Sequence, residues 1–110
     1  MKNLSINNIV QRSLEIRRKY HALEEEHHGS RWSVEEDALA FLTDAGLVGR
    51  LTMSHQGRWP ANDKDLSQLK HKLGEGIWWL IVLAERMDLN IAEEVDGFLR
   101  RTEARLAGES

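Results

Sequence analysis

The sequence DLSQLKHKLGEGIWWLIVLAER, from Asp65 to Arg86, decides the fold. Apolar residues recur along it at steps of three and four, the period of an α-helix that is buried along one side. They are Leu66, Leu69, Leu73, Ile77, Leu80, Ala84 and Met87. Because the second half of this helix is apolar nearly all round, it requires neighbours on most sides. We therefore predict the central helix of a four-helix bundle that self-associates as a dimer or tetramer.

The composition indicates one helical domain. The chain has 110 residues, of which 41% are hydrophobic, with one proline and no cysteine. This length suits a single domain over residues 1–110, and the scarcity of alternating β-branched residues favours an all-α fold. A chain without cysteine cannot form disulfides or a thiolate metal site and fits a reducing compartment, so we expect a cytoplasmic protein.

Two classes of partner are not expected. No apolar run approaches the ~20 residues that span a membrane, and the N-terminal segment lacks the apolar stretch of a secretory signal. The net charge of −3 argues against a nucleic-acid polymer, whose binding proteins usually carry a basic face. We therefore expect neither a membrane nor a nucleic-acid polymer as partner.

Capping residues divide the chain into four predicted helices, over about residues 6–28, 34–53, 66–86 and 91–106. Ser33 and Glu36 form a capping box ahead of the second helix, and Gly29 is suited to end the first one. Residues suited to cap the first, third and fourth helices are Ser5, Asp65 and Asn90.

The chain resembles the MazG-like nucleotide pyrophosphohydrolases, most clearly between His71 and Leu106, where it reads HKLGEGIWWLIVLAERMDLNIAEEVDGFLRRTEARL. The third helix of that family carries an ELxD pattern and then an apolar aromatic run, matched here by residues 72–75 and 77–80. A short turn and a fourth helix with basic residues follow. The family's EExxE motif in the second helix corresponds to residues 43–47. The resemblance covers most of the chain from about Trp32 onward and implies a single MazG-like helical domain.

This resemblance implies Mg²⁺-dependent hydrolysis of a nucleoside triphosphate to the monophosphate and pyrophosphate. In the family, carboxylates on two helices hold the magnesium ion, which grips the phosphates while a water attacks. The five matching positions of this chain are Thr43, Asp44, Leu47, Lys72 and Glu75. The resemblance therefore implies that Asp44 and Glu75 are the catalytic residues and metal ligands.

The remaining residues of the expected site follow from the same resemblance. Glu36, on the same helix as Asp44, is expected as a further metal ligand. Lys72, Arg101 and Arg105 are expected to neutralise phosphate oxygens of the nucleotide. Trp32 has a common counterpart ahead of the second helix of the family and is expected to bind substrate.

Two of the five metal positions favour a different interpretation. Leu47 offers no ligand atom, and Lys72 repels a divalent ion by about 4 kcal/mol per unit charge at ~4 Å and an effective dielectric near 20. A repulsion of this size would lower the affinity for the metal ion roughly a thousandfold. The alternative is a catalytically degenerate MazG-like module that binds a nucleotide or a protein partner without hydrolysis. In such a module, Trp78 and Trp79 either anchor a partner or fill the core.

Overall fold

The computed structural model describes residues 4–58 and 66–108, which form four α-helices and no strand. The helices are α1 (Ile6–His28), α2 (Val34–His55), α3 (Ser67–Arg86) and α4 (Ile91–Leu106). The all-α prediction is confirmed, and the element order is consistent with a four-helix bundle. A bundle of the MazG type and self-association remain predictions. Among the described helices, none is long and apolar enough to cross a membrane.

The helix boundaries follow the capping residues. The Ser33 hydroxyl accepts from the backbone N–H of Glu36, whose carboxylate accepts in return from the backbone N–H of Ser33, and Gly29 ends α1 with a φ of 76°. Helix α2 continues two residues beyond the predicted end, to His55, and the chain turns at Gly57 with a φ of 78°. Helix α3 begins one residue later than predicted. The predicted cap at Asp65 lies outside the described residues.

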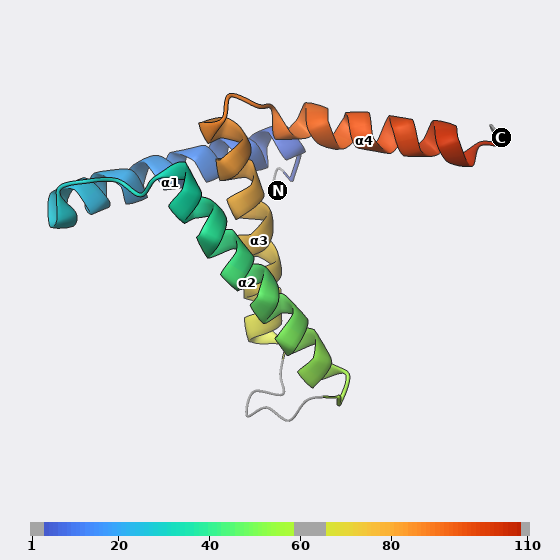
Figure 1. Cartoon of the computed structure of the whole chain (residues 1–110), viewed down its shortest axis with the longest axis horizontal. Coiled ribbons are helices and arrows are strands. Elements are labelled where there is room, and N and C mark those ends of the chain that lie inside the picture. Colours follow the sequence, from blue (N-terminus) through green and yellow to red (C-terminus); the bar gives the residue numbers. More distant parts are fainter. Residues whose placement is uncertain (1–3, 59–65, 109–110) are drawn as a thin grey trace.

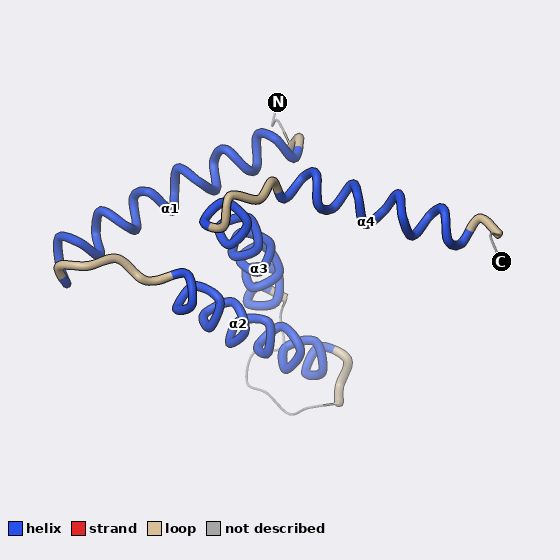
Figure 2. The backbone as a smooth tube through the Cα atoms, turned by 45° about the horizontal axis from the view of Figure 1, so that its top comes forward, coloured by secondary structure: helices blue, strands red, loops and turns tan. Residues whose placement is uncertain are grey.

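Helix α3 is the centre of the arrangement (Figure 1). Helix α2 runs alongside it in the opposite direction, α1 crosses near its C-terminal end, and α4 leads away from that end (Figures 1 and 2). Among residues 4–58 and 66–108, the buried hydrophobic residues all belong to α3 and are Trp79, Ile81, Val82 and Ala84. The prediction of a central third helix therefore agrees with the structure.

The face that α3 buries differs from the predicted one. Leu73, Ile77 and Leu80, in the middle of the expected stripe, are 53%, 54% and 38% exposed. Helices α1 and α2 instead pack against the side that carries Trp79 and Val82, and α4 leaves the opposite side uncovered. The helical period was predicted correctly, but the period alone does not specify which apolar side meets a neighbour within one chain.

Helix α4 has the same unburied character. No residue of α4 is buried, and its apolar stripe of Val95, Phe98, Leu99 and Leu106 is between 48% and 76% exposed. The radius of gyration is 17.2 Å, whereas a compact domain of this length has roughly 13 Å. The chain is therefore an open arrangement with two exposed apolar stripes, on α3 and on α4.

We expect Ser33→Ala to lower the free energy of unfolding by about 1 kcal/mol, because the hydroxyl satisfies a backbone N–H at the start of α2. Chemical denaturation of the wild type and the variant measures this difference. The exposed Ser30, three residues earlier in the turn, gives the control Ser30→Ala, which should change stability by less than about 0.5 kcal/mol. Equal losses in both variants would contradict the capping role.

Candidate functional site

A lysine lies between two carboxylates where α2 and α3 face each other. The Nζ atom of Lys72 donates to Oδ1 of Asp44 at 3.1 Å and to Oε1 of Glu75 at 2.9 Å. Asp44 belongs to α2, whereas Lys72 and Glu75 stand one turn apart on α3. The structure thus brings together three of the sequence-predicted site residues, which we call the lysine-bridged cluster.

Further hydrogen bonds hold this cluster in place. The second carboxylate oxygen of Asp44 accepts from the indole N–H of Trp79 at 3.0 Å, and the His71 ring lies 3.7 Å from the same Glu75 oxygen that Lys72 contacts. The bonds to Glu75 and Asp44 raise the pKa of Lys72 above its ordinary value. The ammonium group is therefore charged at neutral pH and neutralises both carboxylates in part.

The donor groups around the lysine-bridged cluster do not fit a magnesium ion. Magnesium requires a near-octahedral set of oxygen ligands, and here an ammonium lies between the only two carboxylates of the cluster. The Thr43 hydroxyl donates to the carbonyl of Leu39, and Leu47 supplies no ligand atom. Within residues 4–58 and 66–108, no group of three or more histidine, aspartate or glutamate residues could hold a metal ion.

Glu36 and Trp32 lie together, but apart from the lysine-bridged cluster. Both line a hollow of about 280 Å³ on α2, with Leu39, Ala40 and Thr43. The Glu36 carboxylate accepts from the backbone N–H of Ser33 at 2.7 Å, so the helix cap uses one of its oxygens. The Trp32 ring stacks on Trp79 with centroids 6.4 Å apart and planes 6° from parallel. Trp32 is thus linked to Asp44 through Trp79, whose indole N–H donates to the Asp44 carboxylate.

Arg101 and Arg105 are not near the other predicted site residues within one protomer. Both are exposed residues of α4, which leads away from α2 and α3 (Figure 1). The predicted contact of these arginines with the phosphates of a nucleotide bound at Asp44 and Glu75 therefore has no support from the arrangement of a single chain.

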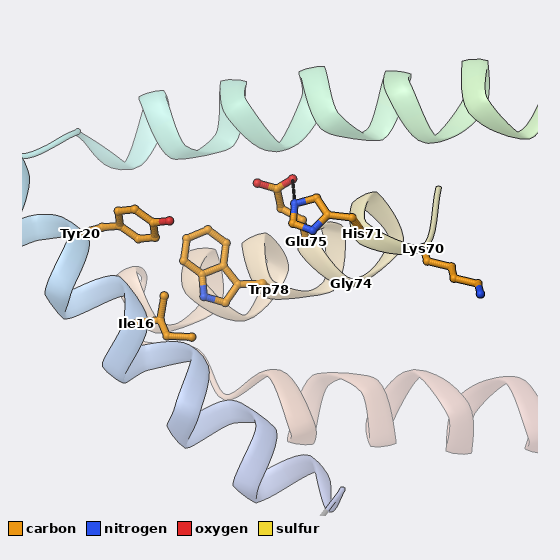
Figure 3. Close-up of a pocket in the computed structure, with 7 residues that line it drawn as sticks. All are labelled: Ile16, Tyr20, Lys70, His71, Gly74, Glu75 and Trp78. Carbon is orange, nitrogen blue, oxygen red and sulfur yellow. Dashed lines mark ion pairs between the residues drawn. The ribbon is translucent and has the colours of Figure 1, made fainter. Parts of the chain in front are cut away.

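An apolar hollow of about 390 Å³ adjoins the lysine-bridged cluster (Figure 3). Ile16 and Tyr20 of α1 face Trp78 of α3 across it, with Glu75 and His71 at one side (Figure 3). The Tyr20 and Trp78 rings meet edge to face at 5.9 Å. Ile16 and Tyr20 are not among the site residues predicted from the sequence, although both lie on α1 and line this hollow.

The two adjacent tryptophans differ in burial. Trp79 is 7% exposed and packs against Trp78 with centroids 4.7 Å apart. The Trp78 indole N–H donates to the carbonyl of Ser13 at 3.1 Å, which ties α3 to α1. Trp79 therefore fills the core of the protomer, and Trp78 forms a wall of the hollow.

A second cluster of charges, which is not among the residues predicted from the sequence, lies at the other end of the α2–α3 contact. The fully buried carboxylate of Asp37 accepts from Arg17 at 2.9 Å and from Arg86 at 2.8 Å. Arg17 also pairs with Glu24 at 3.0 Å. The sequence marks only the burial of Arg17 and not its partner, since Arg17 stands three residues from both Leu14 and Tyr20, at the apolar period of α1.

Glu24 connects this second cluster to the turn between α1 and α2. Its carboxylate accepts from the backbone N–H of Trp32 at 2.9 Å, and the Trp32 carbonyl accepts from Arg86 at 2.8 Å. Burial by itself would raise the pKa of Glu24, but the bonds from Trp32 and Arg17 outweigh it and lower the pKa. The cluster therefore fixes α1, α2, α3 and the turn relative to one another.

The comparisons with known proteins leave the family open. No protein-family model, no curated protein and no solved structure matches this chain. The resemblance to the MazG-like pyrophosphohydrolases therefore stays a prediction from the residues quoted above.

We expect Asp37→Asn to lower the free energy of unfolding by about 3 kcal/mol or more, because it removes the fully buried negative charge that Arg17 and Arg86 share. Chemical denaturation measures the loss. Asp96→Asn is the matched control, since Asp96 forms an exposed pair with Arg100 and such pairs contribute at most about 1 kcal/mol. A loss for Asp37→Asn no larger than for Asp96→Asn would contradict the role of the buried cluster.

Proposed function

We propose that this chain is a non-hydrolysing, self-associating helical module of the MazG-like type, in which Lys72 stands in place of a divalent metal ion. The observation that carries the proposal is the position of the Lys72 ammonium between Asp44 and Glu75. A cation built into α3 neutralises the carboxylates that would otherwise attract magnesium.

The free-energy cost of exchanging the Lys72 ammonium for a magnesium ion supports this assignment. A magnesium ion entering between Asp44 and Glu75 must displace an ammonium that makes two charge-assisted hydrogen bonds, each contributing about 1.5–3 kcal/mol. It must also shed part of its hydration shell in return for only two protein carboxylates. Both costs favour the lysine over the metal ion. Without a bound metal ion, this arrangement does not activate a water molecule for hydrolysis. Binding of a nucleoside triphosphate without hydrolysis remains compatible with the proposal.

Self-association follows from the exposed stripes of α3 and α4. Leu73, Ile77 and Leu80 of α3 and the stripe of α4 cannot meet within one chain, because α4 leads away from α3. A second copy offers the same two stripes, so a two-fold arrangement covers all four at once. A standard interface buries roughly 800 Å² on each partner, so both stripes together offer a surface suited to one.

We expect wild-type protein to form no monophosphate from a panel of nucleoside triphosphates with Mg²⁺, as measured by chromatography of the products. The double variant Leu47→Glu/Lys72→Glu should acquire a Mg²⁺-dependent rise in melting temperature, since it joins four carboxylates where the bridging lysine stood. Leu47→Glu/Lys70→Glu is the matched control, because it has the same net charge and leaves Lys72 in place.

Two outcomes would contradict the replacement of the metal by Lys72. One is monophosphate production by the wild type that disappears in Glu75→Gln, which would support the hydrolase instead. The other is a magnesium-dependent stabilisation of the wild type as large as that of Leu47→Glu/Lys72→Glu.

We expect the wild type to elute as a dimer or larger species and Phe98→Glu to shift toward the monomer, because the new charge lies in the apolar stripe of α4. Size-exclusion chromatography with light scattering gives the mass. Ala104→Glu adds the same charge at an exposed position on the side of α4 that faces away from the stripe, and it should leave the mass unchanged. A monomeric wild type, or equal dissociation in both variants, would exclude self-association through this stripe.

A further inference from the structure

A small hollow lined mainly by cationic groups lies where α1, α3 and the turn after α1 meet. Its volume is about 280 Å³. Its polar lining consists of Arg17, Arg18, His21, Arg31, Glu85 and Arg86. It lies at the C-terminal end of α3, whereas the lysine-bridged cluster lies near the middle of that helix, so the two sites are distinct.

Two buried nitrogen atoms of this hollow lack hydrogen-bond partners among the described residues. They are Nε of Arg17 and Nε2 of His21, which stand one turn apart on α1. The Arg17 side chain is only 6% exposed, and its two terminal nitrogens are already bonded to Glu24 and Asp37. A buried N–H donor without a partner costs about 1–3 kcal/mol, so an acceptor placed in the hollow would recover that energy.

The electrostatic environment of His21 also favours an anion. Burial lowers the pKa of His21, and the charges of Arg17, Arg86 and Arg31 lower it further. Glu24 acts in the opposite direction. The potential at the imidazole is therefore positive, even though each of these three arginines has a carboxylate partner.

Among the charged residues at the rim of the hollow, one arginine is available to bind an anion. Arg18 is exposed and makes no ion pair with the described part of the chain, whereas Arg31 pairs with Glu25 at 2.7 Å. Glu85 is the one carboxylate that lines the hollow. Its charge limits the affinity for a dianion and suits an oxyanion that carries a proton, which can donate to Glu85.

We propose that this hollow binds a tetrahedral oxyanion, namely phosphate or the phosphate group of a phosphomonoester, through the Nε–H of Arg17, Nε2 of His21 in its protonated form and the guanidinium of Arg18. The volume is below the roughly 300–1,000 Å³ of pockets that enclose a whole drug-sized ligand. The hollow therefore takes the anionic group alone, and any attached organic part extends into solvent.

The test is an NMR titration of the histidine side chains of the full-length protein with sodium phosphate at pH 7, at constant ionic strength. Saturable shifts should appear at His21, and phosphate should raise the pKa of His21, because a bound anion stabilises the imidazolium. The other four histidines, His27, His28, His55 and His71, are internal controls that should not saturate with the same dissociation constant. Sodium chloride in place of phosphate should produce no saturable shift.

Rim variants keep the test independent of folding, because Arg18 and Glu85 do not contact the buried Asp37. Arg18→Gln should weaken phosphate binding about tenfold, which is the loss expected for one charge-assisted hydrogen bond. Arg12→Gln, an exposed position earlier on α1, is the matched control and should bind as the wild type does. Glu85→Gln should bind phosphate more tightly.

Adenosine monophosphate distinguishes the two sources of the phosphate group. Tighter binding than inorganic phosphate would identify a phosphomonoester ligand, and equal binding would identify the free anion; both results support the site. The absence of a saturable shift at His21, or equal affinities of Arg18→Gln and Arg12→Gln, would overturn the proposal. Neither result depends on whether the lysine-bridged cluster hydrolyses nucleotides.

Discussion

Two aspartates on one face of α2 hold the structure together. Asp37 and Asp44 stand seven residues apart, which is two helical turns, so both point toward α3. Each meets cations of the neighbouring helices: Arg17 and Arg86 at one end, and Lys72 at the other. Because a buried carboxylate without a counter-charge is costly, these pairs fix the direction and register of α3 against α2.

The pairing of Asp44 with Lys72 also decides the chemistry that the α2–α3 contact allows. A lysine can neutralise two carboxylates without leaving the protein, whereas a metal ion must be bound from solution and needs more oxygen ligands than this contact offers. The helices are therefore held together by the same groups that the resemblance to the MazG-like family led us to expect as metal ligands. The exposed stripes of α3 and α4 form the surface on which we propose that a second copy binds.

Helix positions were predictable from the sequence because capping is local. Ser33 with Glu36 and Asn90 with Glu93 bond within one turn, and their residue types suffice to identify them. The direction of α4 was not predictable, because the apolar period of a helix does not state whether its stripe packs against its own chain or a partner. Of the site, the meeting of Asp44, Lys72 and Glu75 followed from the family resemblance. The pairing of Asp37 with Arg17 joins residues 20 positions apart and leaves no periodic signal.

A crystal structure of the wild-type protein grown with a high concentration of magnesium measures directly what occupies the space between the two carboxylates. We predict the Lys72 ammonium within hydrogen-bond distance of both Asp44 and Glu75, with no metal density between them. A magnesium ion ~2.1 Å from oxygens of both carboxylates, with the Lys72 side chain turned away, would contradict the claim that Lys72 takes the place of a metal ion.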